Sequence, residues 1–285
     1  MSELTPEQQH EIRVVEHSST ATHRHIEKMT VGMIDIGDRE QPFSSGTFID
    51  MYGHLLIATA AHCIPPDPHG RLWILSDLPR KAEDGLLGIV WHQRDSALDV
   101  GFLEINKSVA YTYFSEKVYC PPDRLSPVCP VTDSALVTLV GNPAQRAVAD
   151  YKTKTLAAKC DAFTTGTLPA SQWPSVPSTE RPADLNTDVF LDYPKELRNL
   201  QQGATMGACS PAGFSGGGIW NQNLVKGNMW LPEAATLLAI QSSWQENHRY
   251  LRATQVVHWL RLVWRYYSDI RPQIEKQFPQ AEFEH

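Results

Sequence analysis

From about residue 30 to residue 245, the chain is a series of short apolar runs separated by polar, turn-forming residues. The runs are Val31–Ile36, Gly46–Ile49, His54–Thr59, Leu72–Leu75, Leu87–Trp91, Val100–Ile105, Ala135–Val140, Lys154–Ala158, Val189–Leu191, Gly218–Trp220 and Ala235–Gln241. Many short strands at near-regular spacing are typical of an all-β barrel or sandwich rather than of alternating β-α-β units. One longer segment, Ala170–Thr187, is rich in Pro, Ser, Thr and Asp and predicts a surface loop.

The two ends of the chain carry helical patterns instead. Near the N-terminus, the sequence Thr5-Pro6-Glu7 predicts a helix that Thr5 caps and Pro6 begins, within a polar arm over residues 1–29. Near the C-terminus, apolar residues recur at helical spacing within Thr254–Tyr267. We expect this second helix to pack on the β-rich part of the chain. A helix that lies on a membrane surface is the alternative.

Composition and charge narrow the functions open to the chain. A net charge of -7, with no basic stripe interleaved with aromatic residues, gives no electrostatic reason to bind nucleic acid. No stretch approaches the roughly 18 apolar residues of a membrane span, and the first thirty residues lack the apolar run of a signal peptide. The five cysteines include no C-x-x-C pair, which indicates reduced thiols. We therefore expect a cytoplasmic protein.

Histidines near the N-terminus raise the question of a metal site. His23 and His25 flank Arg24, with His17 upstream, but no helically spaced His-Glu-x-x-His sequence accompanies them. A solvated arm accounts for these histidines, and we expect neither a metal nor a cofactor.

A serine between glycines is the first candidate for chemistry, in the sequence Gly213-Phe214-Ser215-Gly216-Gly217. A nucleophilic serine needs an exposed hydroxyl on a tight turn, with backbone N–H groups directed at the carbonyl oxygen that it attacks. Flanking glycines permit that backbone and leave room for a substrate. Because glycine-flanked serines are also common in ordinary turns, this motif alone leaves both interpretations open.

Two further motifs supply possible partners for the serine. The sequence Thr-Ala-Ala-His-Cys at 59–63 places His62 at a predicted strand end, where an imidazole can take and return a proton. The sequence Asp-Ser-Ala-Leu-Asp-Val-Gly at 95–101 places Asp99 before an apolar strand, where a carboxylate can hold a histidine in one tautomer. Taken alone, each residue also fits an ordinary polar or turn position.

Together, the three motifs resemble those of the chymotrypsin and trypsin family of serine peptidases and occur in the same order. Ser45–Ile49 is similar to the family strand that leads to the histidine, and Arg252–Leu260 resembles the start of its closing helix. The resemblance covers about residues 31–268. It implies an all-β fold of two six-stranded antiparallel β-barrels, with a C-terminal α-helix and the active site between the barrels.

The resemblance also assigns regions and roles along the chain. The regions are a polar arm (1–29), a first barrel (30–130), a second barrel (131–250), and a C-terminal helix and tail (251–285). The implied function is a serine endopeptidase that cleaves a protein or peptide substrate through an acyl-enzyme. Its catalytic triad would be His62, Asp99 and Ser215, and its oxyanion hole the backbone N–H groups of Gly213 and Ser215.

The residue before the serine departs from the family pattern. Phe214 replaces an aspartate that, in digestive relatives, pairs with a newly cut amino terminus, and the sequence near Thr30 lacks the matching Ile-Val-Gly-Gly-like start. We expect the Phe214 ring to be held by apolar packing beneath the turn, and the uncut chain to be active. Any regulation would come from a partner, the substrate or the N-terminal arm acting on the active-site loops.

By the same resemblance, five residues line the substrate pocket: Cys209, Ser210, Ser243, Trp244 and Gln245. Cys209 stands at the pocket floor, where trypsin-like enzymes carry aspartate, and Gln245 replaces a wall glycine and shortens the pocket. Because burying an unpaired cation is costly, we expect a small or medium uncharged residue before the scissile bond. We also expect Ser243 to hydrogen-bond to Asp99.

Two other functions compete with the peptidase. Gly-x-Ser-x-Gly also fits the nucleophile elbow of an α/β-type serine esterase, which places an acid and then a histidine after the serine. Here that order occurs with Glu246 before His248 or His258, or in the C-terminal tail. A catalytically silent protease fold used for binding is the second alternative, although all three triad residues are present.

Overall fold

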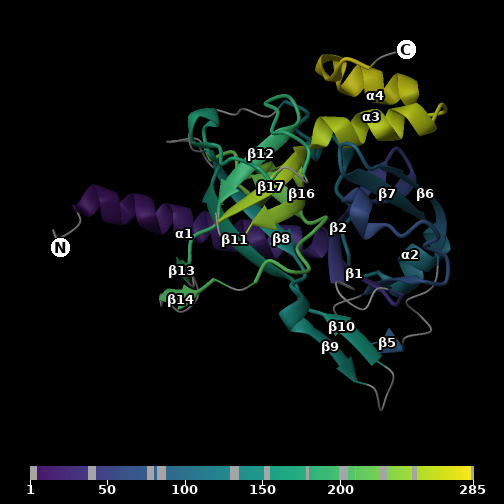
Figure 1. Ribbon diagram of the computed structural model, residues 1–285, viewed down its shortest axis with the longest axis horizontal. Coiled ribbons are helices and arrows are strands. Elements are labelled where there is room, and N and C mark those ends of the chain that lie inside the picture. Colours follow the sequence, from purple (N-terminus) through teal and green to yellow (C-terminus); the bar gives the residue numbers. More distant parts are fainter. Residues whose placement is uncertain are drawn as a thin grey trace.

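The computed structural model describes residues 5–37, 43–75, 80–81, 88–128, 135–150, 155–177, 180–198, 205–208, 210–224, 230–245 and 249–283. Two six-stranded antiparallel sheets form its centre, one from each half of the chain (Figure 1). The prediction of an all-β fold with two six-stranded antiparallel barrels and a C-terminal α-helix is confirmed.

The first sheet has the strand order β4-β1-β2-β3-β7-β6. Its strands are β1 (Thr30–Asp35), β2 (Phe43–Met51), β3 (His54–Thr59), β4 (Leu72–Leu75), β6 (Ile89–Asp95) and β7 (Val100–Ile105). Val31 and Met33 on β1, and Leu55 and Ile57 on β3, are at most 2% exposed and share one core with Phe48. Their alternate spacing is the period of two that directs every second strand residue to the same face.

The second sheet has the order β11-β8-β15-β16-β17-β12. Its strands are β8 (Leu136–Gly141), β11 (Asp161–Gly166), β12 (Asp188–Asp192), β15 (Gly218–Asn221), β16 (Thr236–Gln245) and β17 (Tyr250–Gln255). A backbone bridge between Thr167 and Leu191 joins the two edges and closes the barrel. Around this barrel the strands run first, second, third, sixth, fifth, fourth. The first sheet repeats that succession, so both halves share one topology.

A third apolar cluster lies between the barrels and carries the C-terminal helices. It joins Ile49, Met51, Leu56, Val140, Trp220, Ile240, Trp259 and Leu260, among others. The helices are α3 (Val256–Tyr266) and α4 (Arg271–Gln277), which lie together near the C-terminus (Figure 1). Helix α3 lies within the predicted helical segment Thr254–Tyr267. Residues 252–255 belong to β17, which pairs with β12 and β16, so the second barrel extends beyond its predicted end at residue 250.

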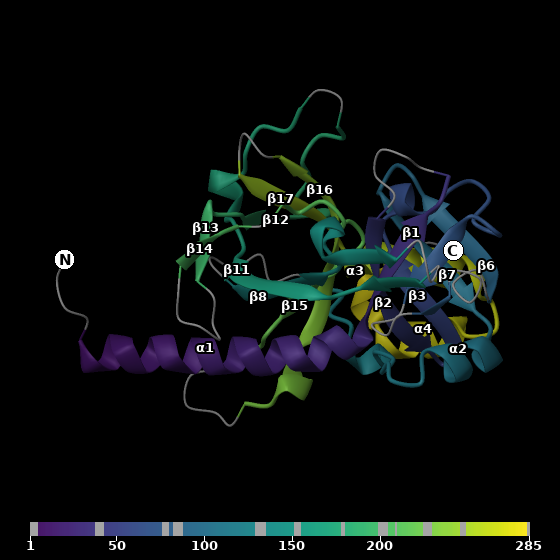
Figure 2. The same cartoon turned by 90° about the horizontal axis from the view of Figure 1, so that it is seen from below.

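Most of the described part of the N-terminal arm is one helix, α1 (Pro6–Ile26), which starts as predicted with Thr5 as its cap and Pro6 in its first turn. It runs along the second barrel, with its N-terminal end directed away from the rest of the molecule (Figure 2). Its second half is not solvated: Ser18, Ser19 and Thr22 are at most 4% exposed. The helix is therefore docked on the barrel rather than a free arm.

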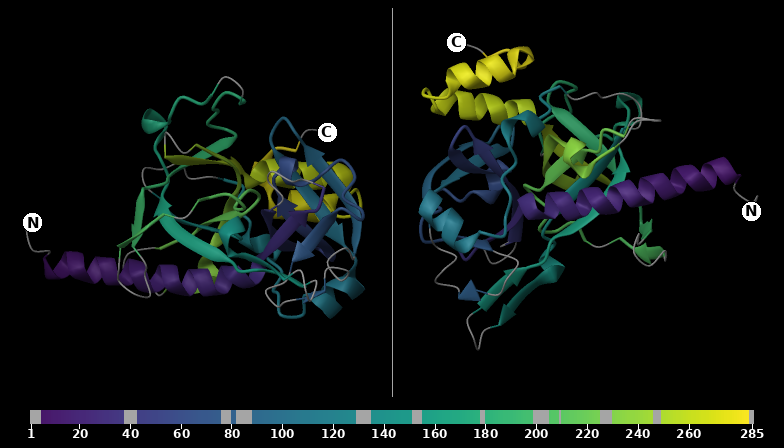
Figure 3. Two further views of the ribbon diagram at one scale, coloured as in Figure 1. Left: turned by 60° about the horizontal axis from the view of Figure 1, so that its bottom comes forward. Right: turned by 180° about the vertical axis from the view of Figure 1, so that it is seen from behind.

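A small sheet connects the two halves at the opposite end of the molecule from α3 and α4 (Figure 3). It has the order β5-β10-β9, with β5 (Arg80–Lys81) from the first half and β9 (Ala147–Asp150) and β10 (Thr155–Ala158) from the second. Besides short 3₁₀ turns, the described residues also form α2 (Lys107–Tyr113) and a pair of strands, β13 (Glu196–Arg198) and β14 (Thr205–Gly207). No helix in the described ranges has the length and apolar content needed to cross a bilayer.

Candidate active site

His62 and Asp99 lie at neighbouring strand ends of the first barrel. His62 follows β3 in a short 3₁₀ turn, Ala61–Cys63, and Asp99 is the last residue before β7. The two strands pair antiparallel with Thr59 opposite Gly101, so the residues after β3 and those before β7 meet at one end of the sheet. Strand pairing thus brings together two residues that are distant in sequence.

Asp99 holds His62 through three close contacts. The backbone N–H of His62 donates to Asp99 Oδ1 at 3.0 Å, and its Nδ1 lies 3.1 Å from Oδ1 and 2.9 Å from Oδ2. A carboxylate at Nδ1 favours the tautomer with its proton there, which leaves Nε2 as the basic nitrogen. Asp99 adopts a φ of 53°, in the left-handed region that Asp tolerates better than most residues. Both side chains stay in contact with solvent, 48% exposed for His62 and 30% for Asp99.

Neighbouring sulfur and carboxylate groups raise the pKa of the His62 imidazole above 6.5. The Cys63 side chain contributes most, desolvation opposes the shift, and Asp99 adds to it through its hydrogen bond and its charge. The hydrogen bond from Nδ1 to the Asp99 carboxylate favours the protonated imidazole. His62 is therefore a stronger base than an isolated histidine.

Ser215 lies on a tight turn that requires glycine at two positions. Gly213 and Gly216 have φ values of +93° and +85°, which side-chain-bearing residues rarely adopt. A Cβ atom on Gly216 would lie 2.0 Å from Thr59 Oγ1 and 2.1 Å from the carbonyl oxygen of Ser45. Because Thr59 leads into the segment that carries His62, this close approach brings the serine turn of the second barrel against the histidine end of the first.

Every backbone carbonyl from residue 211 to residue 215 accepts a hydrogen bond. The pairs are Phe214 N to Pro211 (2.9 Å), Ala144 N to Ala212 (2.9 Å), Ser45 Oγ to Gly213 (2.6 Å), Gly217 N to Phe214 (2.7 Å) and Ser45 N to Ser215 (2.7 Å). In a planar trans peptide the N–H points opposite to the C=O. The bonds to the Ala212 and Phe214 carbonyls therefore fix the directions of the N–H groups of Gly213 and Ser215.

Those two N–H groups have no acceptor within the described residues. By contrast, the N–H groups of Phe214 and Gly216, which alternate with them along the turn, both donate to carbonyls. Buried backbone donors are almost always paired, so two fixed, unpaired donors next to a serine mark a place that an acceptor can occupy. Oxyanion stabilisation requires donors of this kind, held in position before the reaction.

Ser45, on β2 of the first barrel, clamps this turn and is fully buried. Its N–H and hydroxyl donate to the carbonyls of Ser215 and Gly213, and its hydroxyl accepts from the N–H of Asn142 at 2.7 Å. The ring of Phe214, within the same turn, is 2% exposed and packs in the apolar core of the second barrel. The expectation that apolar packing holds Phe214 beneath the turn is confirmed.

The third side-chain contact of the predicted triad is not made in this structure. Among the described residues, the ring of His62 hydrogen-bonds to Asp99 but not to the hydroxyl of Ser215. Such bonds are often long in free enzymes and tighten when substrate binds. The structure thus brings the three residues to adjoining strand and turn ends, with the acid–base pair already joined.

The structure bears differently on the predictions made for the pocket residues. Cys209 lies outside the described residues, and Ser210 is half-buried beside the serine turn. The expectation that Ser243 bonds to Asp99 is wrong, because its hydroxyl donates to Glu180 Oε2 at 3.1 Å. A β-bulge lies just before Ser243, where the register of β16 with β17 shifts between Gln241 and Ser243.

Glu180, which the sequence interpretation missed, belongs to a charge network beside these pocket residues. It accepts from Gln245 Nε2 at 2.7 Å and lies 3.4 Å from Arg252 Nη1. Arg252 and Arg181 both bind the fully buried Asp188 at 2.8 and 2.6 Å. Two acids and two arginines balance, so the group carries no net charge. No local pattern marks Glu180, because its partners are 63 to 72 residues away in sequence.

No metal-binding cluster of three or more His, Cys, Asp or Glu side chains occurs in the described part of the chain.

Comparison with known proteins gives evidence about the fold. No protein-family model and no curated protein matches the chain. Among solved structures, the scabies mite inactivated protease paralogue S-I1 is similar, with a TM-score of 0.51 and 12% sequence identity, over 87% of this chain and 99% of its own. At this identity the likeness shows the fold alone, a chymotrypsin-like double barrel.

Proposed function

We propose that this chain is a serine endopeptidase that hydrolyses peptide bonds of a protein substrate through an acyl-enzyme. Ser215 is the nucleophile, His62 the general base and then acid, and Asp99 the residue that orients and stabilises the imidazole. The backbone N–H groups of Gly213 and Ser215 bind the oxyanion of the tetrahedral intermediate.

This proposal rests mainly on one observation, the pattern of hydrogen bonds in the turn at 211–215. All five of its carbonyls are bonded, while the N–H groups of Gly213 and Ser215 have no acceptor among the described residues. A turn that merely linked two strands would have no need to hold two donors unpaired beside a serine. The Asp99–His62 pair next to that turn supplies the base that a serine nucleophile needs.

The reaction follows from these positions. Ser215 Oγ attacks the substrate carbonyl carbon while His62 Nε2 takes the hydroxyl proton, and the carbonyl oxygen becomes an oxyanion between the two N–H donors. His62 then gives the proton to the departing amine as the peptide bond breaks. Water repeats the sequence on the acyl-enzyme, releasing the acid and restoring Ser215.

The substrate side of the proposal rests on charge. The network around Glu180 is balanced, so the carboxylate beside Ser243 and Gln245 leaves no surplus negative charge for a Lys or Arg side chain. Cleavage should therefore follow a small or medium uncharged residue. If a proteome-derived peptide digest analysed by mass spectrometry shows predominant cleavage after Lys or Arg, the predicted preference for an uncharged residue is wrong. A cytoplasmic location and a regulatory partner for the loops remain predictions.

A catalytically silent, binding role is the second candidate. It is favoured by the missing Ser215–His62 hydrogen bond in the described structure and by the similar mite protein, which its name describes as an inactivated protease. A silent fold, however, would not need to keep the pair of unpaired donors.

Covalent labelling decides between the two. A serine-directed phosphonate should add one equivalent to Ser215 of the full chain, detected by intact mass, and no label should appear in Ser215→Ala. His62→Ala should label far more slowly, and Asp99→Asn should lower turnover by on the order of 10⁴, because the wrong tautomer then faces Ser215. Absence of labelling in the folded wild-type chain, or peptide cleavage retained by Ser215→Ala, would overturn the peptidase assignment.

A further inference from the structure

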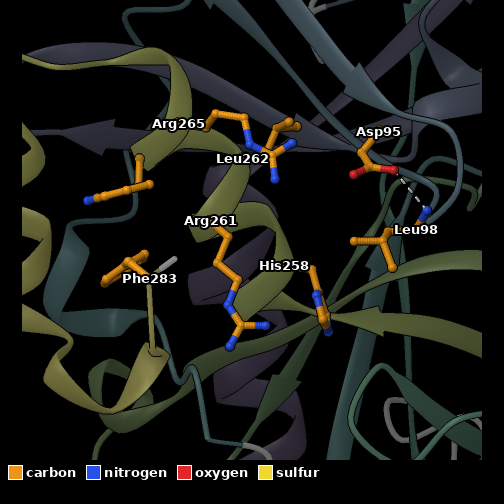
Figure 4. A pocket seen from close by; sticks show the side chains of 8 residues that line it. Asp95, Leu98, His258, Arg261, Leu262, Arg265 and Phe283 are labelled. Carbon is orange, nitrogen blue, oxygen red and sulfur yellow. Dashed lines mark hydrogen bonds between the residues drawn. The ribbon is translucent and has the colours of Figure 1, made fainter. Parts of the chain in front are cut away.

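A hollow of about 200 Å³ lies between α3, the turn that precedes Asp99 and the last described residues of the chain (Figure 4). Its polar side chains are His258, Arg261 and Arg265 from one side of α3 and Asp95 from the turn. Its apolar lining consists of Leu98, Leu262, Trp264 and Phe283. None of these residues takes part in the chemistry proposed above. We call it the α3 hollow.

In the described part of the chain, the ion pairs include neither of the two arginines. Arg261 and Arg265 stand one helical turn apart, where like charges destabilise a helix. Arg261 Nε donates to the carbonyl of Ala281 at 2.9 Å, and the ion pairs of the described residues involve other arginines, such as Arg181 and Arg252. An anion between the two guanidinium groups would relieve their repulsion.

The other polar groups leave that charge in place. His258 is 8% exposed, and burial, together with Arg261, lowers its pKa, so it is neutral near pH 7. Its Nε2 hydrogen-bonds to the carbonyl of Asn186 at 2.9 Å. Asp95 Oδ1 accepts from the N–H groups of Ala97 and Leu98, at 3.0 and 3.1 Å, within its own turn. Two cations against one such carboxylate leave the lining net positive, in a chain of net charge -7.

The apolar side of the hollow is ordered as well. The rings of Trp264 and Phe283 stack with centroids 5.4 Å apart and an angle of 20° between planes. Leu98 and Leu262 complete this side. A bare inorganic anion would use the arginines alone, whereas a group with both a carboxylate and an apolar side chain would use the whole lining.

We infer that the α3 hollow binds an acidic peptide segment in which a carboxylate side chain stands next to an apolar one. The inferred source rests on the proposed function: it is a part of the protein substrate outside the scissile region. Thr254 Oγ1 donates to the Leu98 carbonyl at 2.7 Å and Trp259 Nε1 to the Gly101 carbonyl at 3.1 Å, so the strand and helix bordering the hollow also fix both sides of Asp99. A segment held there stays at a constant distance from the catalytic residues, which raises the effective concentration of the bond to be cut.

Binding is tested in the full chain with Ser215→Ala, so that its outcome does not depend on catalysis. The probe is the peptide acetyl-Asp-Phe-Glu-Leu-amide, titrated by calorimetry against its uncharged counterpart acetyl-Asn-Phe-Gln-Leu-amide. We expect only the acidic peptide to bind, more weakly as salt rises, and about three- to tenfold more weakly after Arg265→Gln or Arg261→Gln. Arg265→Gln is the cleaner change because Arg261 also holds Ala281. The matched control is Arg13→Gln, which removes the same charge from an exposed position on α1.

Three results would overturn the inference: equal binding of the two peptides, an equal loss in the Arg13 control, or no loss in either α3 variant. Inorganic phosphate that displaces the peptide at matching concentrations would show an anion site without the apolar part, and so would also overturn it. If the wild-type chain fails to label at Ser215 while the peptide binds as expected, the peptidase assignment fails and the binding site stands.

Discussion

Ser45 shows how one buried hydroxyl of the first barrel organises the serine turn of the second. Its side chain bridges the carbonyl of Gly213 and the N–H of Asn142, at 2.6 and 2.7 Å, while its backbone N–H holds the carbonyl of Ser215. Phe214 cannot make the ion pair expected at its position in digestive relatives. In this chain, hydrogen bonds from Ser45 and apolar packing of Phe214 order the same turn.

Ser45→Ala should therefore lower the rate of Ser215 acylation by about 10- to 100-fold, less than the full loss of an oxyanion donor. KM should change little, because the serine contacts the turn rather than the substrate pocket. The measurement is kcat and KM on a peptide identified by the digest, together with the rate of phosphonate labelling. Ser44→Ala is the control, since Ser44 is its similarly buried neighbour on β2. Equal losses in both variants would mean that the strand, not the hydroxyl, matters.

The pKa of His62 sets the acid limit of the proposed activity. Cys63 and Asp99 raise it above 6.5, and only the neutral imidazole can take the proton of Ser215. Activity should thus be lost as pH falls through a value above 6.5. Removing the carboxylate charge by Asp99→Asn should move the acid limb of the labelling rate to lower pH. An acid limb below pH 6.5 in the wild type, or one unmoved in Asp99→Asn, would contradict this account.

At the scale of elements, α1 and β1 form one docked unit. Gln222 is fully buried and donates to the hydroxyls of Ser19 and Thr138, at 3.0 and 2.8 Å, which ties the helix to the second barrel. Thr30 and Val31, at the start of β1, are each 1% exposed and pair with β2. A new amino terminus made here would place a charged ammonium group in a buried strand.

Cleavage between Lys28 and Val31 should consequently not activate the chain. We expect the uncut chain to titrate fully with an active-site phosphonate, and the cut form to lose activity and stability. The comparison uses intact mass and active-site titration of both forms. The expectation fails if only the cut form titrates and if acetylation of its new amino terminus then removes the activity.

At the scale of the whole molecule, a polar joint attaches the C-terminal segment to the first barrel. His54 lies between Glu104 and Asp269, with its ring nitrogens 2.8 and 2.9 Å from their carboxylates. Tyr267 donates to the second oxygen of Glu104 at 3.0 Å. Desolvation acts against the charged imidazole, but the bonds to Glu104 and Asp269 outweigh it and raise the pKa of His54 above 6.5.

A raised histidine pKa stabilises the fold where the imidazolium is present. The contribution is complete below the unfolded pKa of 6.5 and is lost as pH rises through the higher folded value. The urea midpoint should thus fall between pH 6 and pH 8.5 by more in the wild type than in His54→Gln. His69→Gln, which changes an exposed histidine elsewhere in the first half of the chain, serves as the control. Identical pH dependence in the wild type and His54→Gln would refute this role.

Local sequence patterns predicted much of the candidate site and of the elements around it. The glycines around Ser215, the cap of α1 by Thr5 and the alternating apolar residues of β1 and β3 act within a few residues of themselves, so their patterns predict turn, helix and strand. The sequence pattern did not predict strand β11, because Asp161–Gly166 is only partly buried on both faces and has little apolar alternation. Its place is fixed by pairing with β8, which local patterns do not contain.

Strand period, turn glycines and short motifs are local properties, so the sequence alone predicts an all-β chain of short strands and the order of His62, Asp99 and Ser215, while the resemblance of the motifs implies two barrels. The partners that these residues meet are set by the folded structure. In the second barrel, Ser243 bonds to Glu180 beside a bulge in β16, and the packing of the two barrels places Ser45 against the serine turn. The docking of α3 brings His258, Arg261 and Arg265 around a hollow with Asp95. Each of these contacts joins residues more than 60 positions apart, and such distances close only when strands pair into barrels and the barrels and helices pack together.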